Sequence, residues 1–585
     1  MVTHVRSPLW SVVLAAILPV ASADAQWRHD GVPVCTAAGR QDSPVAVFDG
    51  SGGVILAWLD YRSSTTVQVY AQRLNAAGVP QWQSNGIPLT SVSNEQFAPV
   101  AVSDGVGGAI VAWTQRHTVD DLNNYDVYAQ RINSAGALLW GSSGVPLCVV
   151  PQFRTSLVII SDGRNSPAIG GSPGAIVAWE DGRAGITHDI YSQAVDASGT
   201  VRWTTNGVPV CTASSSQTVP AMVTDGIGLN AFSPKGAIIT WRDSRNSNGN
   251  NDIYAQRLNV GGVPQWTANG IMVCTNSSHQ EWPAAAYTGP GNAIIAWPDS
   301  RDGGYGLYAQ RVGASGGEWL ADGLLVSQAS GSAQTPEMIG DGKGGAIMVW
   351  EAFDLPHRIL MQRVNGNGLP IWTADGLQLC GGPTIGGQFG PAVIGVAGGA
   401  IVAWEDRRNG IEFQNGNIYI QRVDSAGVAQ WNPDGLPVCQ ALGIQHSATL
   451  ASDGAGGAIM AWTDARNSDV DRDIYANHVT GDGNVVGVGA VRVDDFKLLA
   501  PFPNPTAGSV DISFQLSEVR TVTAQIFGVD GRLIRTLTRQ EFSAGLHALH
   551  WDGSNDSYTR VRTGVYFIRM SAGATSNICK VLLID

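Results

Sequence analysis

One pattern recurs along most of the chain, and its most regular tryptophans follow one another at intervals of 53 to 66 residues. Its clearest copy opens with Asp-Gly-Val-Gly-Gly at 104–108 and continues into the apolar run Ala109 to Trp113. The segment Asp126 to Asn133 follows, and the copy ends with Trp140 and with Gly-Val-Pro-Leu-Cys at 144–148. Because a single short copy cannot bury its own apolar residues, the pattern restricts the chain to a repeat architecture whose copies pack on one another.

Each copy predicts four β-strands. The Asp-Gly-x-Gly-Gly sequence is typical of a tight turn, since glycine tolerates positive φ and aspartate supports turns with its side chain. The apolar run Ala109 to Trp113 indicates a strand buried on both faces, whereas the alternation in Asp126 to Asn133 indicates a half-buried strand. An apolar segment before the turn, such as Pro99 to Val102, and the stretch from the second tryptophan to the cysteine supply the other two strands.

Two sets of tryptophans give the number of copies. The first set ends the second strand in eight copies, at Trp58, Trp113, Trp179, Trp241, Trp297, Trp350, Trp404 and Trp462. The second set opens the fourth strand in seven copies, at Trp82, Trp140, Trp203, Trp266, Trp319, Trp372 and Trp431. The eighth copy lacks a fourth strand, and an isolated one, Trp27 to Cys35, stands near the start of the chain. Strands exchanged between the chain ends close a ring and remove its edge, so we predict an all-β, eight-bladed β-propeller closed by an N-terminal strand.

The two ends of the chain depart from the repeat. Residues 1–25 combine His4 and Arg6 with the apolar stretch Leu9 to Val20 and a run of small residues, which is typical of a secretory signal peptide. No later run approaches the roughly 20 apolar residues of a spanning helix, so we expect no membrane span in the mature chain. We predict the propeller over 26–493, with 26–41 as its closing strand, a linker over 494–505 and a separate domain over 506–585.

The C-terminal segment predicts an Ig-like β-sandwich, because about seven short strand patterns follow one another there. Its motifs are Phe-Pro-Asn-Pro at 502–505, Asp-Gly-Arg at 530–532, His-x-x-x-Trp-Asp-Gly at 547–553 and Gly-Val-Tyr-Phe at 564–567. These motifs resemble FlgD-type Ig-like domains and the related C-terminal sorting domains of type IX secretion. The resemblance implies export across a bacterial outer membrane, with the secretion or anchoring machinery as a partner.

Charge and cysteine placement exclude some classes of function. A formal net charge of −13 with no basic patch disfavours binding to nucleic acid. Six of the seven cysteines share one place in a Gly-x-x-x-Cys motif: Cys35, Cys148, Cys211, Cys274, Cys380 and Cys439. Equivalent positions in successive copies should lie beyond the roughly 7 Å Cα separation that a disulfide permits. We therefore expect small buried side chains and not disulfides.

Acidic residues are the candidates for chemistry. Six copies carry Asp-x-Arg after the first-set tryptophan: Asp60/Arg62, Asp181/Arg183, Asp243/Arg245, Asp299/Arg301, Asp406/Arg408 and Asp464/Arg466. A catalytic acid would occur once, so the recurrence indicates structural ion pairs, and we interpret the breaks at 115–117 and 352–354 as drift. The acids outside the repeated motif include five glutamates that we consider as candidates: Glu180, Glu281, Glu337, Glu351 and Glu405. Two adjacent carboxylates could hydrolyse a glycoside, but nothing in the sequence places two of these together.

A cofactor is suggested only weakly. Asp469, Asp471 and Asp473 alternate as calcium ligands do, but the glycine and the closing glutamate of a calcium loop are absent, so we favour a solvated loop. The histidines show no zinc spacing.

Together the sequence favours a non-enzymatic propeller, secreted or on the outer-membrane surface, that binds a protein or polysaccharide. The alternative is a propeller-fold carbohydrate-active enzyme, a glycoside hydrolase or lyase. Two non-repeated carboxylates about 5 to 10 Å apart in the central channel would favour the enzyme. A channel lined by small or apolar residues at equivalent positions would favour binding.

Overall fold

The computed structural model describes residues 27–63, 66–118, 124–163, 173–228, 233–246, 249–328, 332–354, 356–380, 386–408, 416–468, 470–486, 496–498, 501, 504–516, 519–542, 545–572 and 575–584. The chain divides into two compact units, Met1–Gly487 and Val488–Asp585. All regular structure in the described residues is β-strand, which confirms the predicted all-β class. Among these residues no helix long and apolar enough to cross a membrane occurs.

The described strands of the first unit form eight antiparallel sheets, numbered here 1 to 8 in the order of their first strands. Sheet 1 contains β2 (Gln41–Phe48), β3 (Val54–Asp60), β4 (Gln68–Leu74) and β5 (Ile87–Pro88), and sheet 2 contains β6 (Gln96–Ser103), β7 (Ala109–Arg116), β8 (Tyr125–Ile132) and β9 (Val145–Cys148). Sheet 3 contains β10 (Arg154–Ser161), β11 (Ala175–Asp181), β12 (Asp189–Val195) and β13 (Val208–Cys211), and sheet 4 contains β14 (Gln217–Thr224), β15 (Ala237–Asp243), β16 (Asp252–Leu258) and β17 (Ile271–Cys274).

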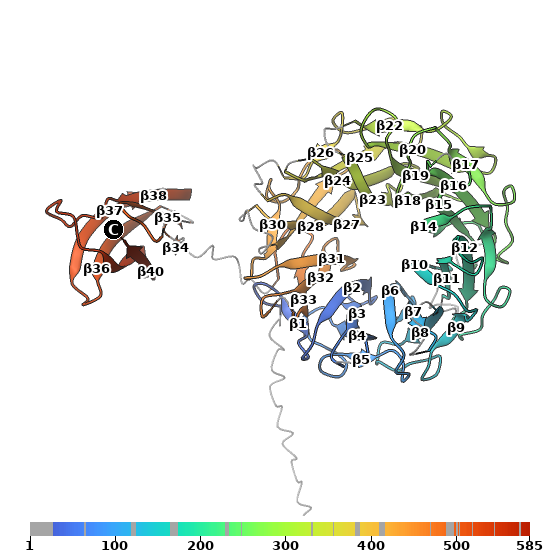
Figure 1. Ribbon diagram of the computed structural model, residues 1–585, viewed down its shortest axis with the longest axis horizontal. Helices are drawn as coiled ribbons and strands as arrows, with labels where there is room; N and C mark the ends of the chain where they lie inside the picture. Colours follow the sequence, from blue (N-terminus) through green and yellow to red (C-terminus); the bar gives the residue numbers. More distant parts are fainter. Residues whose placement is uncertain are drawn as a thin grey trace, which may run out of the picture. The chain divides into compact units, whose positions relative to one another are not determined.

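Sheet 5 contains β18 (Ala284–Gly289), β19 (Asn292–Asp299), β20 (Gly306–Gly313), β21 (Gly316–Gly317) and β22 (Leu324–Ser327), and sheet 6 contains β23 (Ser332–Gly340), β24 (Ala346–Phe353), β25 (Arg358–Val364) and β26 (Leu377–Gln378). Sheet 7 contains β27 (Gln388–Val396), β28 (Gly399–Asp406), β29 (Asn417–Asp424) and β30 (Leu436–Cys439), and sheet 8 contains β31 (Gln445–Ser452), β32 (Ala458–Asp464), β33 (Asp473–Val479) and β1 (Val32–Cys35). Figure 1 shows these sheets as a ring with the first strand of each innermost.

The chain ends meet in sheet 8, where the N-terminal strand β1 pairs antiparallel with β33. Trp27 extends the junction to the next sheet, because its indole Nε1 donates a hydrogen bond to the Ala76 carbonyl in sheet 1 at 2.9 Å. At Gly31, whose φ is +87°, a Cβ would lie 2.6 Å from the Trp462 ring, so only glycine fits between β1 and this tryptophan. The expected exchange of the N-terminal strand is therefore observed.

The first-set tryptophans are the centres of the sheet contacts. All eight are almost completely buried, and their indoles lie among apolar residues of two neighbouring sheets. Three of the second strands that carry them, β3, β11 and β32, are buried along their whole length, and the others are buried at most positions. The uninterrupted apolar runs thus form strands covered on both faces, as the sequence predicts.

In seven sheets the first strand contains a bulge with a residue in the left-handed region, at Ser43, Ala98, Ser156, Val219, Thr335, Gly390 and Ser447, and in sheet 5 the left-handed residue Trp282 lies just before β18. These residues lie at one end of the ring, which we call the entry face: there each first strand begins and each second strand ends, as the pairing of Gln41 with Asp60 shows. The opposite end, where the first and second strands are joined by a hairpin, is called the hairpin face.

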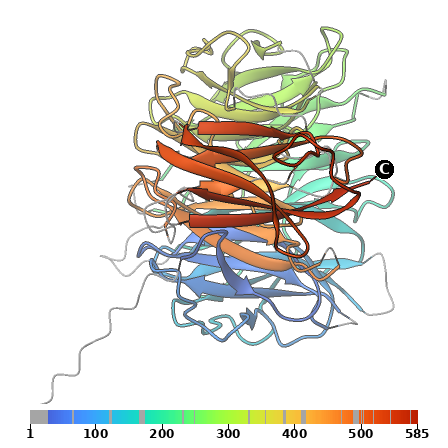
Figure 2. The same ribbon diagram turned by 90° about the vertical axis from the view of Figure 1, so that its left-hand side faces the viewer.

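The second unit has two sheets around its own core (Figure 2). One contains β34 (Phe496–Leu498), β35 (Val510–Leu516) and β38 (Gly545–Trp551). The other contains β36 (Arg520–Gly528), β37 (Leu533–Phe542), β39 (Gly564–Ala572) and β40 (Thr575–Leu583). The structure differs from the sequence at 496–498, which were assigned to a linker: β34 pairs with β35, because that strand has an otherwise open edge.

Candidate functional site

The six Asp-x-Arg motifs are buried structural ion pairs at the contacts between sheets. In sheet 4 the Trp241 Nε1 donates to Asp243 Oδ2 at 2.7 Å, and Arg245 Nε donates to Asp243 Oδ1 at 2.9 Å. Arg245 Nη2 also reaches Cys211 Sγ of sheet 3 at 3.0 Å, and its guanidinium lies 3.8 Å from the centre of the Tyr254 ring. One side chain thus joins a carboxylate, a thiol and an aromatic ring across two sheets.

The same contact recurs at six junctions, with Arg Nη2 to Cys Sγ distances of 3.0 to 3.4 Å: Arg62/Cys35, Arg183/Cys148, Arg245/Cys211, Arg301/Cys274, Arg408/Cys380 and Arg466/Cys439. All six cysteines are buried thiols and form no disulfide, as the sequence predicts. Burial raises the pKa of Cys211 to about 12, so the thiol stays protonated and is no nucleophile.

The two breaks in the motif each coincide with loss of the cysteine in the preceding sheet. Gln115 replaces the aspartate in sheet 2, and sheet 1, its neighbour, has Thr90 where the cysteine would be. Ala352 replaces the aspartate in sheet 6, and sheet 5 has Ser327 at the cysteine position. Since thiol and guanidinium are contact partners, the two are lost together. This pairing could have been found in the sequence, because each copy that lacks the Asp-x-Arg motif directly follows a copy that lacks the cysteine.

The central channel carries a single carboxylate at one set of equivalent positions. The position lies on the first strand of each sheet, opposite the residue that precedes the first-set tryptophan on the second strand. In seven sheets it is occupied by an uncharged residue: Val45, Val100, Val158, Ala221, Ala284, Ala392 and Thr449. In sheet 6 it is Glu337, which pairs with Val349. Glu337 lines a cavity of about 410 Å³ formed by the first strands of sheets 1, 2, 6, 7 and 8.

The Glu337 carboxylate accepts a hydrogen bond from the Val393 backbone N–H of sheet 7 at 3.2 Å. Its side chain is exposed to the channel, and the loss of part of its solvation among the surrounding strands raises its pKa to about 7.

Glu351 and Glu405 lie on neighbouring sheets at the entry face, each directly after a first-set tryptophan. His357 Nδ1 is 2.8 Å from Glu351 Oε1, and Arg407 Nε donates to Glu405 Oε1 at 2.6 Å. Burial is the main cause that raises the pKa of Glu405, and the nearby Glu351 carboxylate contributes to the rise. The structure thus brings together two of the five candidate glutamates.

Aromatic rings surround this pair. The His357 ring lies 4.0 Å from that of Phe353 and 4.7 Å from that of Phe389, and the Arg407 guanidinium lies 4.4 Å from the Phe389 ring. Phe353 is 52% exposed, so the cluster presents an apolar surface to solvent. Glu351, His357, Phe389, Glu405 and Arg407 together are called the sheet 6–7 cluster below.

Glu180 is the counterpart of Glu351 in sheet 3 but has no second glutamate beside it in the described residues. Its Oε1 accepts the Val219 N–H of the next sheet at 2.7 Å, and His188 Nδ1 lies 3.3 Å from Oε2. Glu351 likewise accepts the Gly390 N–H at 3.4 Å. Both carboxylates therefore hold the left-handed bulge residue of the following sheet in place.

The remaining candidates are separate. Glu281 forms an ion pair with Arg242 at 2.6 Å and accepts from Asn251 Nδ2 at 2.8 Å, which satisfies both of its oxygens. Asp473 accepts from Asn467 Nδ2 at 2.7 Å, while Asp471 is exposed and Asp469 lies outside the described residues. Within the described part of the chain, no three acidic, histidine or cysteine side chains are grouped to hold a metal ion.

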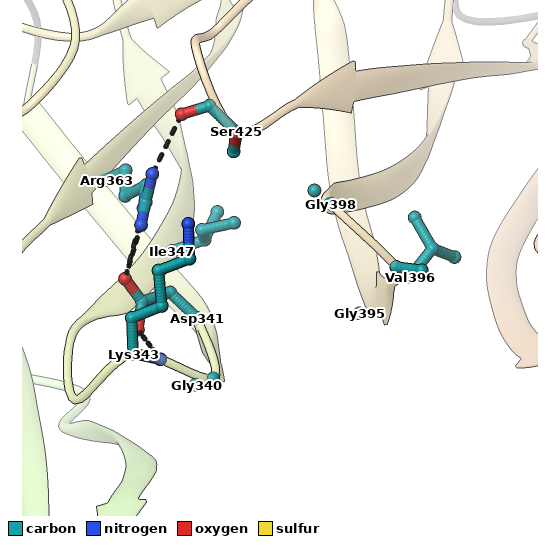
Figure 3. A pocket seen from close by; sticks show the side chains of 12 residues that line it. Gly340, Asp341, Lys343, Ile347, Arg363, Gly395, Val396, Gly398 and Ser425 are labelled. Atoms are coloured by element: carbon teal, nitrogen blue, oxygen red, sulfur yellow. Dashed lines mark hydrogen bonds and ion pairs between the residues drawn. The ribbon is translucent and has the colours of Figure 1, made fainter.

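A cavity of about 460 Å³ on the hairpin face is lined by repeat features (Figure 3). Arg363 Nη2 forms an ion pair with Asp341 at 2.8 Å and Nη1 donates to the Ser425 carbonyl at 2.9 Å. The same pair occurs as Arg73/Asp49 and Arg131/Asp104. Its charges therefore support the hairpin turns.

The second unit is shown by comparison to be an FlgD-type domain. Residues 504–576 match the family described as FlgD Ig-like domain. Over 63 residues the chain is 41% identical to the basal-body rod modification protein FlgD of Salmonella typhimurium, covering 10% of this chain and 27% of that protein. The same values hold for FlgD of Salmonella typhi. The chain thus spans about a quarter of the length of the curated relatives it matches.

Among solved structures the chain is similar to an ulvan lyase, with a TM-score of 0.43 and 10% identity, covering 77% of this chain and 96% of that one. It is similar to the BP39L lectin of Burkholderia pseudomallei, with a TM-score of 0.42 and 10% identity over 68% of this chain and 99% of the lectin. It is also similar to an α-L-arabinanase of Penicillium chrysogenum, with a TM-score of 0.33 and 10% identity over 77% and 98% of the two chains. At TM-scores below 0.5 these likenesses carry no argument about activity.

Proposed function

We propose that this chain is an exported eight-bladed β-propeller that cleaves a polysaccharide at the sheet 6–7 cluster. The observation that carries the proposal is the pair Glu351 and Glu405, two carboxylates at equivalent positions of neighbouring sheets whose charges interact. Glycoside hydrolysis uses two carboxyl groups, one protonated to donate to the leaving oxygen and one ionised. The alternative derived from the sequence is thereby preferred to non-enzymatic binding.

The surroundings assign different roles to the two carboxyl groups. Glu405 has the raised pKa and is the proton donor to the glycosidic oxygen. Glu351 is held by His357 and takes the second role, as nucleophile or as the base for water. Phe353, 52% exposed, provides an apolar ring on which a sugar can lie.

The test is a depolymerisation screen over neutral and acidic polysaccharides, read by new reducing ends and by the ultraviolet absorbance of unsaturated products. Glu405→Gln and Glu351→Gln should each lower kcat at least about 100-fold. Glu180→Gln is the matched control, because Glu180 has the same position, a histidine partner and the same hydrogen bond to the next sheet. Equal losses in all three variants would show a structural effect and would contradict the proposal.

A non-catalytic polysaccharide-binding role is the second candidate, and the seven uncharged channel positions favour it. A wild-type chain that binds a polysaccharide on a glycan array but releases no product, with binding unchanged by Glu405→Gln, would select this candidate.

We also propose that residues 1–25 direct export and that 506–585 act as a sorting or anchoring domain at a bacterial surface. The match of 504–576 to the FlgD Ig-like family supports a role for this domain in assembly outside the cytoplasm. In a bacterium with a type IX system, chain lacking 1–25 should stay in the cytoplasm, and chain lacking 506–585 should stop in the periplasm. Surface display of the latter would contradict the sorting role.

A further inference from the structure

We infer that the channel cavity containing Glu337 is a subsite for one uncharged sugar unit and that Glu337 excludes sugars bearing a carboxylate. The inference rests on the proposed function for its ligand class, since it adds a selective subsite to a polysaccharide-directed propeller. It is independent of the sheet 6–7 cluster, because none of that cluster's residues lines the cavity.

The size and lining of the cavity fit a single sugar. Its volume of about 410 Å³ lies within the range of small-molecule sites, which are mostly apolar with a few polar groups that orient the ligand. Apolar walls come from Pro44, Val45, Pro99 and Val393, and hydroxyl groups from Ser447 and Thr449. Apolar patches suit the C–H faces of a sugar, and the hydroxyls and the carboxylate suit its O–H groups.

Charge decides which sugars fit. Glu337 is the single titratable residue among those that line the cavity. Val393 N–H binds one carboxylate oxygen, Oε2, and Oε1 remains to accept a sugar hydroxyl. A uronic acid would place a second carboxylate in the same cavity as Glu337, where like charges repel. A neutral sugar of the same shape meets no such penalty.

The substitution is specific to one sheet, which argues against a structural need for it. Seven equivalent positions lack charge, and three of them are valine, at Val45, Val100 and Val158.

Proton binding gives the inference a second readout. Glu337 is the single titratable residue that lines the cavity. On the strands that form it, Asp42 of β2 and His446 of β31 lie next to lining residues, whereas β27 has no titratable group. The strands packed on β23 carry Glu351 on β24, Tyr287 on β18, Asp299 on β19, and Tyr308 and Arg311 on β20, so the Glu337 variants are needed to separate its titration from that of these groups. Exclusion of uronic acids should therefore weaken as the pH falls through about 7, where Glu337 becomes protonated.

The experiment measures binding of glucose against glucuronic acid, and of galactose against galacturonic acid, to the full chain by titration calorimetry and saturation-transfer NMR at pH 5.5 and 8. Wild type should bind the neutral member of at least one pair about 10-fold more tightly at pH 8, a difference of about 1.4 kcal/mol, and less selectively at pH 5.5. Glu337→Gln and Glu337→Val should abolish the selectivity at both pH values.

Glu337→Val introduces the residue found at this position in sheets 1 to 3, so it serves as a second test if Glu337→Gln fails to fold. Glu180→Gln is the control and should keep wild-type selectivity. Failure of every neutral sugar to bind, or unchanged selectivity in both Glu337 variants, overturns the inference. Depolymerisation by wild type with no sugar binding in the channel would overturn the subsite alone. Selective sugar binding without any depolymerisation would overturn the catalytic proposal alone.

Discussion

At the scale of single residues, the most informative groups are charged side chains buried between sheets. The Asp243 side chain is fully buried and the Arg245 side chain is 16% exposed, so the charge of each is compensated mainly by the other. Loss of one partner from such a pair leaves an uncompensated buried charge. The repeated Asp-x-Arg motif therefore acts on stability and not on chemistry.

Arg245→Met should destabilise the first unit by about 3 kcal/mol, because Asp243 is left buried without its cation. Arg202→Met is the control, since Arg202 is 51% exposed and its ion pair with Asp196 at 3.3 Å should contribute less than about 1 kcal/mol. Urea denaturation followed by tryptophan fluorescence measures both. Similar losses in the two variants would show that burial of the pair does not matter.

Glu337 should make stability fall as the pH rises. Its pKa is raised to about 7 from an ordinary value of 4.5, so the folded chain binds this proton more tightly than the unfolded chain does. The resulting stabilisation is complete below about 4.5 and is lost as the pH rises through about 7. The Tm of Glu337→Gln minus that of wild type should therefore increase between pH 4 and pH 8, as measured by scanning calorimetry. A difference that stays constant with pH would contradict this.

At the scale of elements, the N-terminal strand β1 decides whether the ring is closed. It supplies the fourth strand of sheet 8, and Cys35 at its end contacts Arg62 of sheet 1 at 3.3 Å. A ring held by both chain ends presents no free sheet edge at this junction.

Gly31→Val should open this junction and lower stability by at least about 2 kcal/mol, since it combines strain at positive φ with a clash on Trp462. Gly50→Val is the matched control, because Gly50 has a similar φ of +77° but no atom within 4 Å of the position that a Cβ would take. Thermal unfolding of the two variants separates backbone strain from the clash. A loss no larger at Gly31 than at Gly50 would mean that the contact with Trp462 is unimportant.

At the scale of the whole molecule, the two units have separate hydrophobic cores. The C-terminal core contains Phe514, Trp551 and Ile568, and the ring has its own clusters between sheets. Two cores of this kind unfold independently unless a large interface joins them.

Calorimetry of the full chain should show two transitions, and residues 488–585 expressed alone should melt at the temperature of one of them. The physical reason is that the FlgD-type unit has a hydrophobic core of its own. A single transition for the full chain, or a shift of more than a few degrees on separation, would contradict independent folding.

The sequence by itself determined the strands, the repeat and the closing segment, because these depend on local chemistry. Apolar runs, glycine turns and two tryptophan sets specify four strands per copy, and Trp27 to Cys35 could be assigned to the eighth copy by pattern alone. The FlgD-type motifs could likewise be identified from short stretches such as 547–553.

Only the tertiary structure decided which residues of different copies meet. Glu351 and Glu405 are 54 positions apart in the sequence, and their proximity follows from the stacking of sheets 6 and 7. Cys211 and Arg245 are partners for the same reason. Glu337 stood among five candidate glutamates, and the ring alone placed it against a cavity where every other lining residue is uncharged. Distances between residues of different copies depend on how the sheets pack around the ring, and local sequence patterns do not specify the packing of segments far apart in the chain.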